Sequence, residues 1–189
     1  MTKKNKMKMI APEIAPDNQG YVAVYTDGGR MKYRCGTILC SIGVYFSHRN
    51  NANVSKIVPS EDNNVAEAMA SLKAIEIAKY NKIRKLKIFT DSQCTINLVN
   101  SLKSQQSRLE QKQRRTREKN LRKHGKLYEK SPVTFEQIVQ LSNMMEDVKF
   151  VWVKGHSKLG VPGRAGNKAA DRLASQALKR AAAATGLIK

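Results

Sequence analysis

The sequence is poor in cysteine, and its three cysteines follow no paired or metal-binding spacing. Cys35, Cys40 and Cys94 form no Cys-x-x-Cys motif, and an odd number of thiols cannot all pair within one chain. These features argue against a disulfide framework and against a zinc knuckle. The cysteine usage therefore predicts an intracellular, reducing compartment, either the cytoplasm or the nucleus.

Aromatic residues and long apolar runs are also scarce. Aromatic residues make up 6% of the chain, and Trp152 is the single tryptophan. This scarcity argues against single-strand binding built mainly on stacked bases. No apolar run approaches the roughly 18 residues of a membrane span, and no signal-peptide core is present. The sequence accordingly predicts no membrane partner.

Acidic residues are few compared with basic ones. The 15 Asp and Glu residues stand against 35 Lys and Arg residues, which gives a formal net charge of +20. Such an excess favours a polyanionic partner, because phosphate neutralisation releases condensed counterions. A basic ribosome-associated protein has the same charge balance and stays open on this evidence. The hydrophobic content of 41% is sufficient for a real core.

The chain is long enough for one domain with tails. Residues 1–19 read as a flexible basic tail, residues 20–184 as the folded domain, and residues 185–189 as a second tail. Within the domain, residues 103–130 contain eleven Lys or Arg residues against three Glu residues. Their apolar residues are sparse, so we expect a basic helical excursion rather than a core element.

Periodicity predicts an α/β domain with a mixed or parallel sheet. Continuous or alternating apolar runs predict strands, and apolar stripes with 3.6-residue spacing predict helices. We expect Gly28 and Gly29 to end the first strand, and Asn63 or Asn64 to cap the first helix. The expected strands span 21–27, 38–46, 54–58, 86–91 and 148–153, and the expected helices span 64–80, 95–102, 131–145 and 167–184.

Four carboxylates lie where these elements could bring them together. Asp27 and Asp91 each end a strand, Glu67 lies on the apolar face of its helix, and Asp171 lies on the final helix. Ligands collect outside the carboxyl ends of strands in open α/β sheets. Singly, each acid could be a cap, a favourable first-turn charge or a solvated residue. Together they suit a hard cation such as Mg²⁺, which neutralises clustered carboxylates.

Five short motifs resemble, in the same order, those of cellular type 1 ribonuclease H. The resemblance covers about residues 21–180 and depends on the order of the motifs rather than on any one of them. The motifs are Tyr25–Gly29, Asn63–Glu67, Thr90–Ser92, Lys154–Ser157 and Gly166–Ala174.

The resemblance implies a ribonuclease H-like fold, a five-stranded mixed sheet flanked by helices. It also implies hydrolysis of the RNA strand of RNA–DNA hybrids to 5′-phosphate and 3′-hydroxyl products. Asp27, Glu67, Asp91 and Asp171 would bind two Mg²⁺ ions, with Mn²⁺ as a possible substitute, and His156 would assist proton transfer or product release. A monomer without a small-molecule cofactor is expected.

The same resemblance indicates where a hybrid would bind. Contacts to ribose 2′-hydroxyl groups distinguish RNA from DNA, and residues 103–130 occupy the place of a basic protrusion that grips the DNA strand. The candidates for 2′-hydroxyl contact are Gly28, Gly29, Asn63, Asn64 and Gln93. The candidates for phosphate contact in the protrusion are Arg114, Arg115, Arg117, Lys119, Arg122 and Lys123.

The sequence departs from the family pattern at three places. Lys168 stands where members often carry an acid, residues 60–62 are acidic where relatives offer phosphate-binding groups, and the loop 158–165 is longer than usual. Other readings are a catalytically silent hybrid-binding module and another nuclease or transposase on the same fold. A free-standing enzyme is favoured over a processed retroelement domain.

Overall fold

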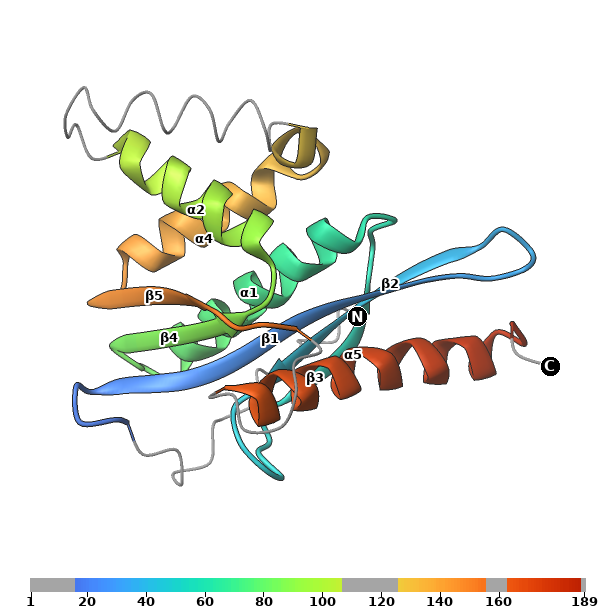
Figure 1. Cartoon of the computed structure of the whole chain (residues 1–189), viewed down its shortest axis with the longest axis horizontal. Helices are drawn as coiled ribbons and strands as arrows, with labels where there is room; N and C mark the ends of the chain where they lie inside the picture. The colour runs from blue at the N-terminus through green and yellow to red at the C-terminus, as the bar shows by residue number, and fades with distance from the viewer. Residues whose placement is uncertain (1–15, 107–125, 156–162, 188–189) are drawn as a thin grey trace, which may run out of the picture.

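A five-stranded mixed sheet forms the centre of the protein, with the strand order β3-β2-β1-β4-β5 (Figure 1). The computed structural model describes residues 16–106, 126–155 and 163–187. Strand β2 pairs with β1 and with β3, in both cases antiparallel. Strand β4 pairs with β1, and β5 pairs with β4, in both cases parallel. The elements are β1 (Tyr21–Lys32), β2 (Ile38–Tyr45), β3 (Val54–Val58), α1 (Asn63–Tyr80), β4 (Lys85–Thr90), α2 (Gln93–Gln106), α4 (Pro132–Asn143), β5 (Asp147–Trp152) and α5 (Arg164–Ala184). The predicted fold class is confirmed.

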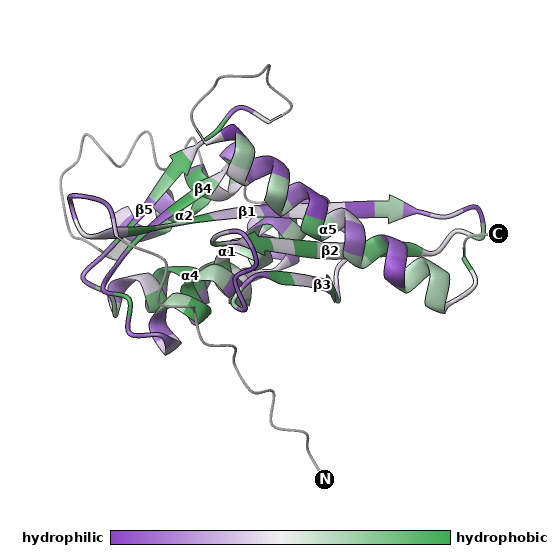
Figure 2. Cartoon of the chain, turned by 90° about the horizontal axis from the view of Figure 1, so that it is seen from below, coloured by the Kyte–Doolittle hydropathy of each residue, from purple (hydrophilic) through white to green (hydrophobic). Residues whose placement is uncertain are grey.

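Helices cover the two faces of the sheet unequally. Helices α1, α2 and α4 lie on one face, and α5 runs along the other face over β1, β2 and β3 (Figure 1). The main core lies under α1, where Val24, Ile75, Ile88 and Phe135 are fully buried. Hydrophobic and hydrophilic residues alternate along the helices, and hydrophobic stretches mark the strands of the sheet (Figure 2). Burying each core side chain contributes about 1.5–3 kcal/mol.

The first strand is longer than predicted. Gly28 and Gly29 do not end β1, because both continue the antiparallel ladder with β2 as far as Lys32. A Cβ atom at Gly28 would lie 2.6 Å from the backbone nitrogen of Glu67, so glycine here permits the close approach of α1. Asp27 therefore lies within β1 rather than at its end, and the prediction that it ends the strand is wrong.

Several helix starts also differ from the prediction, among them that of α2, which begins at Gln93 rather than at residue 95. Asp62, not Asn63 or Asn64, caps α1, and its Oδ1 accepts a hydrogen bond from the Asn64 backbone N–H at 2.8 Å. A carboxylate suits this position because it also meets the positive end of the helix dipole. Helix α5 begins at Arg164 instead of Asn167, whose backbone N–H already donates to the Gly163 carbonyl.

Gly43 lets α5 approach the sheet closely. A Cβ atom there would lie 2.0 Å from the carbonyl oxygen of Ala170, so the helix backbone rests directly on β2. Gly43 also pairs with Asp27 across the β1–β2 ladder, and Ala170 precedes Asp171. This single contact therefore brings Asp171 toward Asp27.

We expect Gly43→Ala to lower the free energy of unfolding by about 3 kcal/mol, because overpacking against backbone atoms forces α5 outward. Urea denaturation of the variant and the wild type measures this change. An unchanged midpoint would mean that α5 does not pack on β2 at this distance.

Several predicted features lie outside the described residues. These are His156, most of the tail 1–19, and the basic residues Arg114, Arg115, Arg117, Lys119, Arg122 and Lys123. Within the described part of the chain, no helix combines the length and the apolar character that crossing a membrane requires.

Candidate active site

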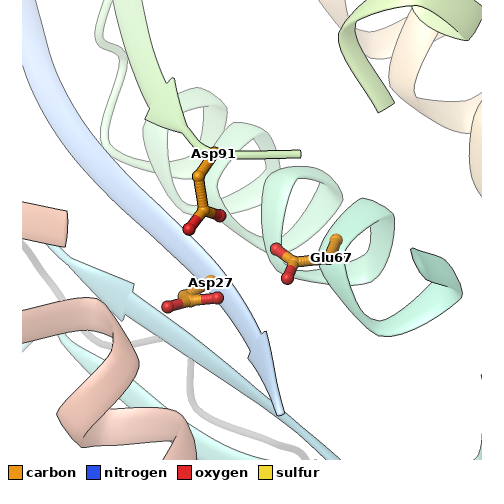
Figure 3. Close-up of side chains that lie close together, drawn as sticks. All are labelled: Asp27, Glu67 and Asp91. Atoms are coloured by element: carbon orange, nitrogen blue, oxygen red, sulfur yellow. The ribbon is translucent and has the colours of Figure 1, made fainter. Parts of the chain in front are cut away.

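Three carboxylates from separate elements meet at one point of the sheet. Asp27 comes from β1, Glu67 from the second turn of α1, and Asp91 from the residue that follows β4 (Figure 3). One oxygen of each lies within 4.8 Å of the other two. The parallel register pairs Tyr25 with Phe89, so Asp27 and Asp91 lie level on neighbouring strands with their carboxyl groups on the same side.

Burial and mutual repulsion both disfavour negative charge in this cluster. Asp27 is 7% exposed and Glu67 is 6% exposed. Burial, followed by the charges of Asp91 and Asp171, raises the pKa of Asp27 to about 7. Burial, followed by the charge of Asp27, likewise raises the pKa of Glu67 well above its ordinary value. One oxygen of Asp27 lies within 4.8 Å of an oxygen of Glu67, so the two carboxyl groups repel each other when both are ionised and no cation is present.

The residues of this cluster fit a hard divalent cation. All three supply oxygen ligands, which Mg²⁺ and Mn²⁺ prefer. Glu67 Oε2 is buried and has no hydrogen-bond partner among the described residues, although Asn63 Nδ2 donates to Glu67 Oε1 at 3.3 Å. An unpaired buried carboxylate oxygen is costly unless a ligand satisfies it. A cation would remove both that cost and the repulsion.

Asp171 lies beside the three-carboxylate cluster but is not one of the three. It comes from α5 and lines, together with Asp27 and Asp91, a pocket with a volume of about 260 Å³. Its charge raises the pKa of Asp27. The structure thus brings all four predicted carboxylates to one region, and three of them are close enough together to bind one metal ion. The pocket is lined by Asp27, Asp91, Lys154, Arg164, Asn167, Lys168 and Asp171.

Asp91 is held by Trp152 and Asn167, which the sequence analysis did not select for the site, and by the backbone of Gln93. Its backbone carbonyl accepts hydrogen bonds from Trp152 Nε1 at 3.3 Å and from the Gln93 backbone N–H at 3.0 Å. Asn167 Nδ2 donates to its carboxylate Oδ2 at 3.4 Å. Asn167 lies within the predicted motif 166–174, but only its proximity to Asp91 in space reveals this contact.

Gly155 lies directly against the Asp91 carboxylate. A Cβ atom at this position would be 2.3 Å from Asp91 Oδ2, so a side chain cannot fit without moving the carboxylate or the loop. The glycine therefore keeps open the space in which Asp91 faces the other acids.

We expect Gly155→Ala to weaken Mn²⁺ binding by about 10- to 100-fold, as is common when the surroundings of a metal ligand change. Isothermal titration calorimetry with Mn²⁺ measures the affinity, and thermal unfolding in EDTA serves as the control for folding. Wild-type Mn²⁺ affinity in the variant would show that the contact does not position Asp91.

The described residues predicted to contact a hybrid lie around the cluster. Gly28 is pressed against the first turns of α1, and Asn63 is hydrogen-bonded to Glu67. Asn64 is exposed, and the exposed Gln93 donates through Nε2 to Asn97 within α2. Gly29 does not face the cluster, because a Cβ atom there would meet side chains of β2 and α5.

Comparisons with known proteins agree with one another. A family model described as RNase H matches residues 19–179. Ribonuclease H1 of Homo sapiens is 33% identical over 184 residues, covering 90% of this chain and 56% of that protein. Ribonuclease H of Syntrophus aciditrophicus is 27% identical over 180 residues, covering 95% of this chain and 93% of that protein. The chain thus spans about half the length of the mammalian relatives it matches.

Solved structures share the fold at low sequence identity. The RNase H1 from the archaeon Halobacterium salinarum aligns with a TM-score of 0.50 and 20% identity, over 85% of this chain and 99% of that one. The foamy viral protease-reverse transcriptase, solved in complex with RNA/DNA hybrid, aligns with a TM-score of 0.58 and 20% identity. That match covers 94% of this chain and 22% of the viral one. These similarities concern the fold alone.

Proposed function

Because the chain belongs to the ribonuclease H family, we propose that it is a metal-dependent endonuclease that cuts the RNA strand of RNA–DNA hybrids. The reaction hydrolyses a phosphodiester bond and leaves a 5′-phosphate and a 3′-hydroxyl group. The observation that carries this proposal is the meeting of Asp27, Glu67 and Asp91, with Asp171 in the adjoining pocket. A protein that only bound hybrids would have no use for so costly a cluster of buried acids.

The four carboxylates would hold two Mg²⁺ ions, for which Mn²⁺ could substitute. Bound ions of this kind supply a water nucleophile at neutral pH and stabilise charge on the departing 3′ oxygen. The protein's own contribution is positioning. Asn63 fixes the Glu67 carboxylate through Oε1, whereas Asn167 and the open space at Gly155 set the direction of Asp91.

Proton transfer needs a group that titrates near neutral pH. We assign this role to His156, which follows Gly155 in the chain and belongs to the motif Lys154–Ser157. An unperturbed imidazole titrates close to neutrality, so it can accept a proton during water attack or help product release.

An RNA–DNA hybrid is the proposed substrate. Membership of the ribonuclease H family supports that assignment, as does the excess of basic residues. Asn63, Asn64 and Gln93 would contact ribose hydroxyl groups, together with the backbone of Gly28 and Gly29. The protein would act as a monomer in a reducing compartment, without a small-molecule cofactor.

Basic residues between 114 and 123 would bind the DNA strand. Reversing the charge of Arg114, Arg115 and Arg117 should weaken hybrid binding and lower the slope of log affinity against log salt by about 3, because each phosphate contact contributes about one counterion. Fluorescence anisotropy at several salt concentrations measures the slope. An unchanged slope would mean that this segment does not touch nucleic acid.

The direct test incubates the protein with a labelled RNA–DNA hybrid and, in parallel, with duplex RNA, duplex DNA and single strands. Each substrate is tested with Mg²⁺ and with EDTA. Cleavage restricted to the RNA strand of the hybrid, and abolished by EDTA, is the expected result. Binding without cleavage would point to a silent binding module, whereas cleavage of another substrate would point to a different nuclease of the same fold.

A further inference from the structure

The pocket beside the carboxylates is lined by cations as well as by acids. Asp27, Asp91 and Asp171 are its acids. Three cations also line it, and within the described residues none of them forms a salt bridge with those acids. The three cations are Lys154, Arg164 and Lys168. Cations that stay unpaired beside carboxylates are available to an anionic ligand.

The residues that line the pocket include the first turn of α5. Arg164 is the first residue of this helix, and its buried Nη1 has no hydrogen-bond partner in the described part of the chain. The preceding Gly163 has no side chain with which to cap the first-turn N–H groups. The positive end of the helix dipole is therefore left to an external anion, a role that phosphate groups often fill.

Asn167 provides independent evidence that a ligand enters this pocket. Its side chain lines the pocket, the residue is only 7% exposed, and Oδ1 has no hydrogen-bond partner among the residues that the structure describes. A buried acceptor of this kind needs a donor from a ligand or an ordered water molecule. Arg164 requires an acceptor and Asn167 a donor, so the pocket suits a ligand that carries both an anionic group and a hydroxyl group.

We infer that Lys154, Arg164, Lys168 and the start of α5 form a subsite for a backbone phosphate of the RNA strand. That phosphate lies next to the phosphodiester held at the carboxylates. A ribonucleotide supplies both required groups, since its phosphate meets the cations and its 2′-hydroxyl group can donate to Asn167 Oδ1. The inference rests on the proposed function, because it identifies the ligand of the same pocket.

The test measures binding in EDTA, where no cleavage occurs. Fluorescence anisotropy gives the affinity of the protein for hybrids whose RNA strand carries one neutral methylphosphonate linkage, placed at each position in turn. The variants are Lys168→Gln and Arg164→Gln, and the control is Lys179→Gln, an exposed lysine farther along the same helix. Thermal unfolding verifies that each variant is folded.

At one position, the neutral linkage should weaken wild-type binding by about tenfold, as expected for the loss of hydrogen bonds between charged groups. The same linkage should have little further effect on the Lys168→Gln and Arg164→Gln variants, while the Lys179→Gln protein should behave as wild type. Additive losses at every position, or no binding of the hybrid, would overturn the subsite.

A parallel cleavage assay with Mg²⁺ separates this inference from the proposed activity. If the hybrid is cleaved but no neutral linkage affects the wild type more than the two variants, the subsite alone is rejected. If one linkage does so but the hybrid is not cleaved, the endonuclease activity is rejected and the subsite is retained.

Discussion

Replacing Asp91 by Asn is expected to reduce metal-dependent cleavage at least about a thousandfold while leaving hybrid binding measurable. The amide keeps the shape of the side chain but removes a negatively charged oxygen that would hold the cation. A thousandfold loss corresponds to about 4 kcal/mol of transition-state stabilisation, which is within what a bound metal ion supplies.

The hydrogen bonds around Asp91 should persist in the variant, so the substitution removes the charge and leaves the local structure in place. Its backbone carbonyl would still accept from Trp152 and Gln93, and an amide oxygen could still accept from Asn167. Folding should therefore be little affected. Single-turnover cleavage and hybrid affinity in EDTA are measured on the same preparation. The control is Glu76→Gln, because among the described residues that acid pairs with Lys73 on α1, away from the site. Undiminished cleavage by Asp91→Asn would reject the assigned site.

Asp27→Asn is expected to stabilise the metal-free protein above neutral pH and at the same time to abolish metal-dependent stabilisation. The pKa of Asp27 rises from 3.8 to about 7 on folding, chiefly because of burial and of the Asp91 and Asp171 charges. Between these pH values the folded state binds more protons than the unfolded state. The contribution of Asp27 to the free energy of unfolding of the wild type is therefore fully present below about pH 4, and it is lost as the pH rises through 7.

The size of the effect follows from the same pKa. A rise in the pKa of Asp27 from 3.8 to about 7 corresponds to about 4 kcal/mol. The neutral amide removes the repulsion between the carboxylates. The free energy of unfolding of the variant should therefore exceed that of the wild type most at pH 8 and little at pH 4. The difference between variant and wild type isolates Asp27 from the other carboxyl groups.

Urea unfolding in EDTA at pH 4, 6 and 8 measures this difference. Adding Mg²⁺ at about one hundred times its dissociation constant should stabilise the wild type by about 3 kcal/mol at pH 8 and the variant hardly at all. A variant less stable than wild type at pH 8, or equally stabilised by Mg²⁺, would contradict the assignment of Asp27 to a repulsive metal-binding cluster.

The amino-acid sequence by itself determined the kinds of elements, their order and the identity of the acids. Apolar periodicity predicted the strand 54–58 and the helix 64–80 almost to the residue, because a buried strand and a buried helix each require apolar side chains at fixed intervals. The order of five short motifs indicated the family. These are local properties, which depend on neighbouring residues in the chain.

The tertiary structure decided how these residues act together. Gly28 looked like the end of a strand, yet it continues β1, because the close approach of α1 replaces the missing side chain. The raised pKa values of Asp27 and Glu67 arise from burial and from charges far away in sequence. Likewise, the unpaired polar atoms of Arg164 and Asn167 are recognisable only once the partners around them are known. Distances between elements, which determine repulsion, burial and unmet hydrogen bonds, are set by packing rather than by local sequence.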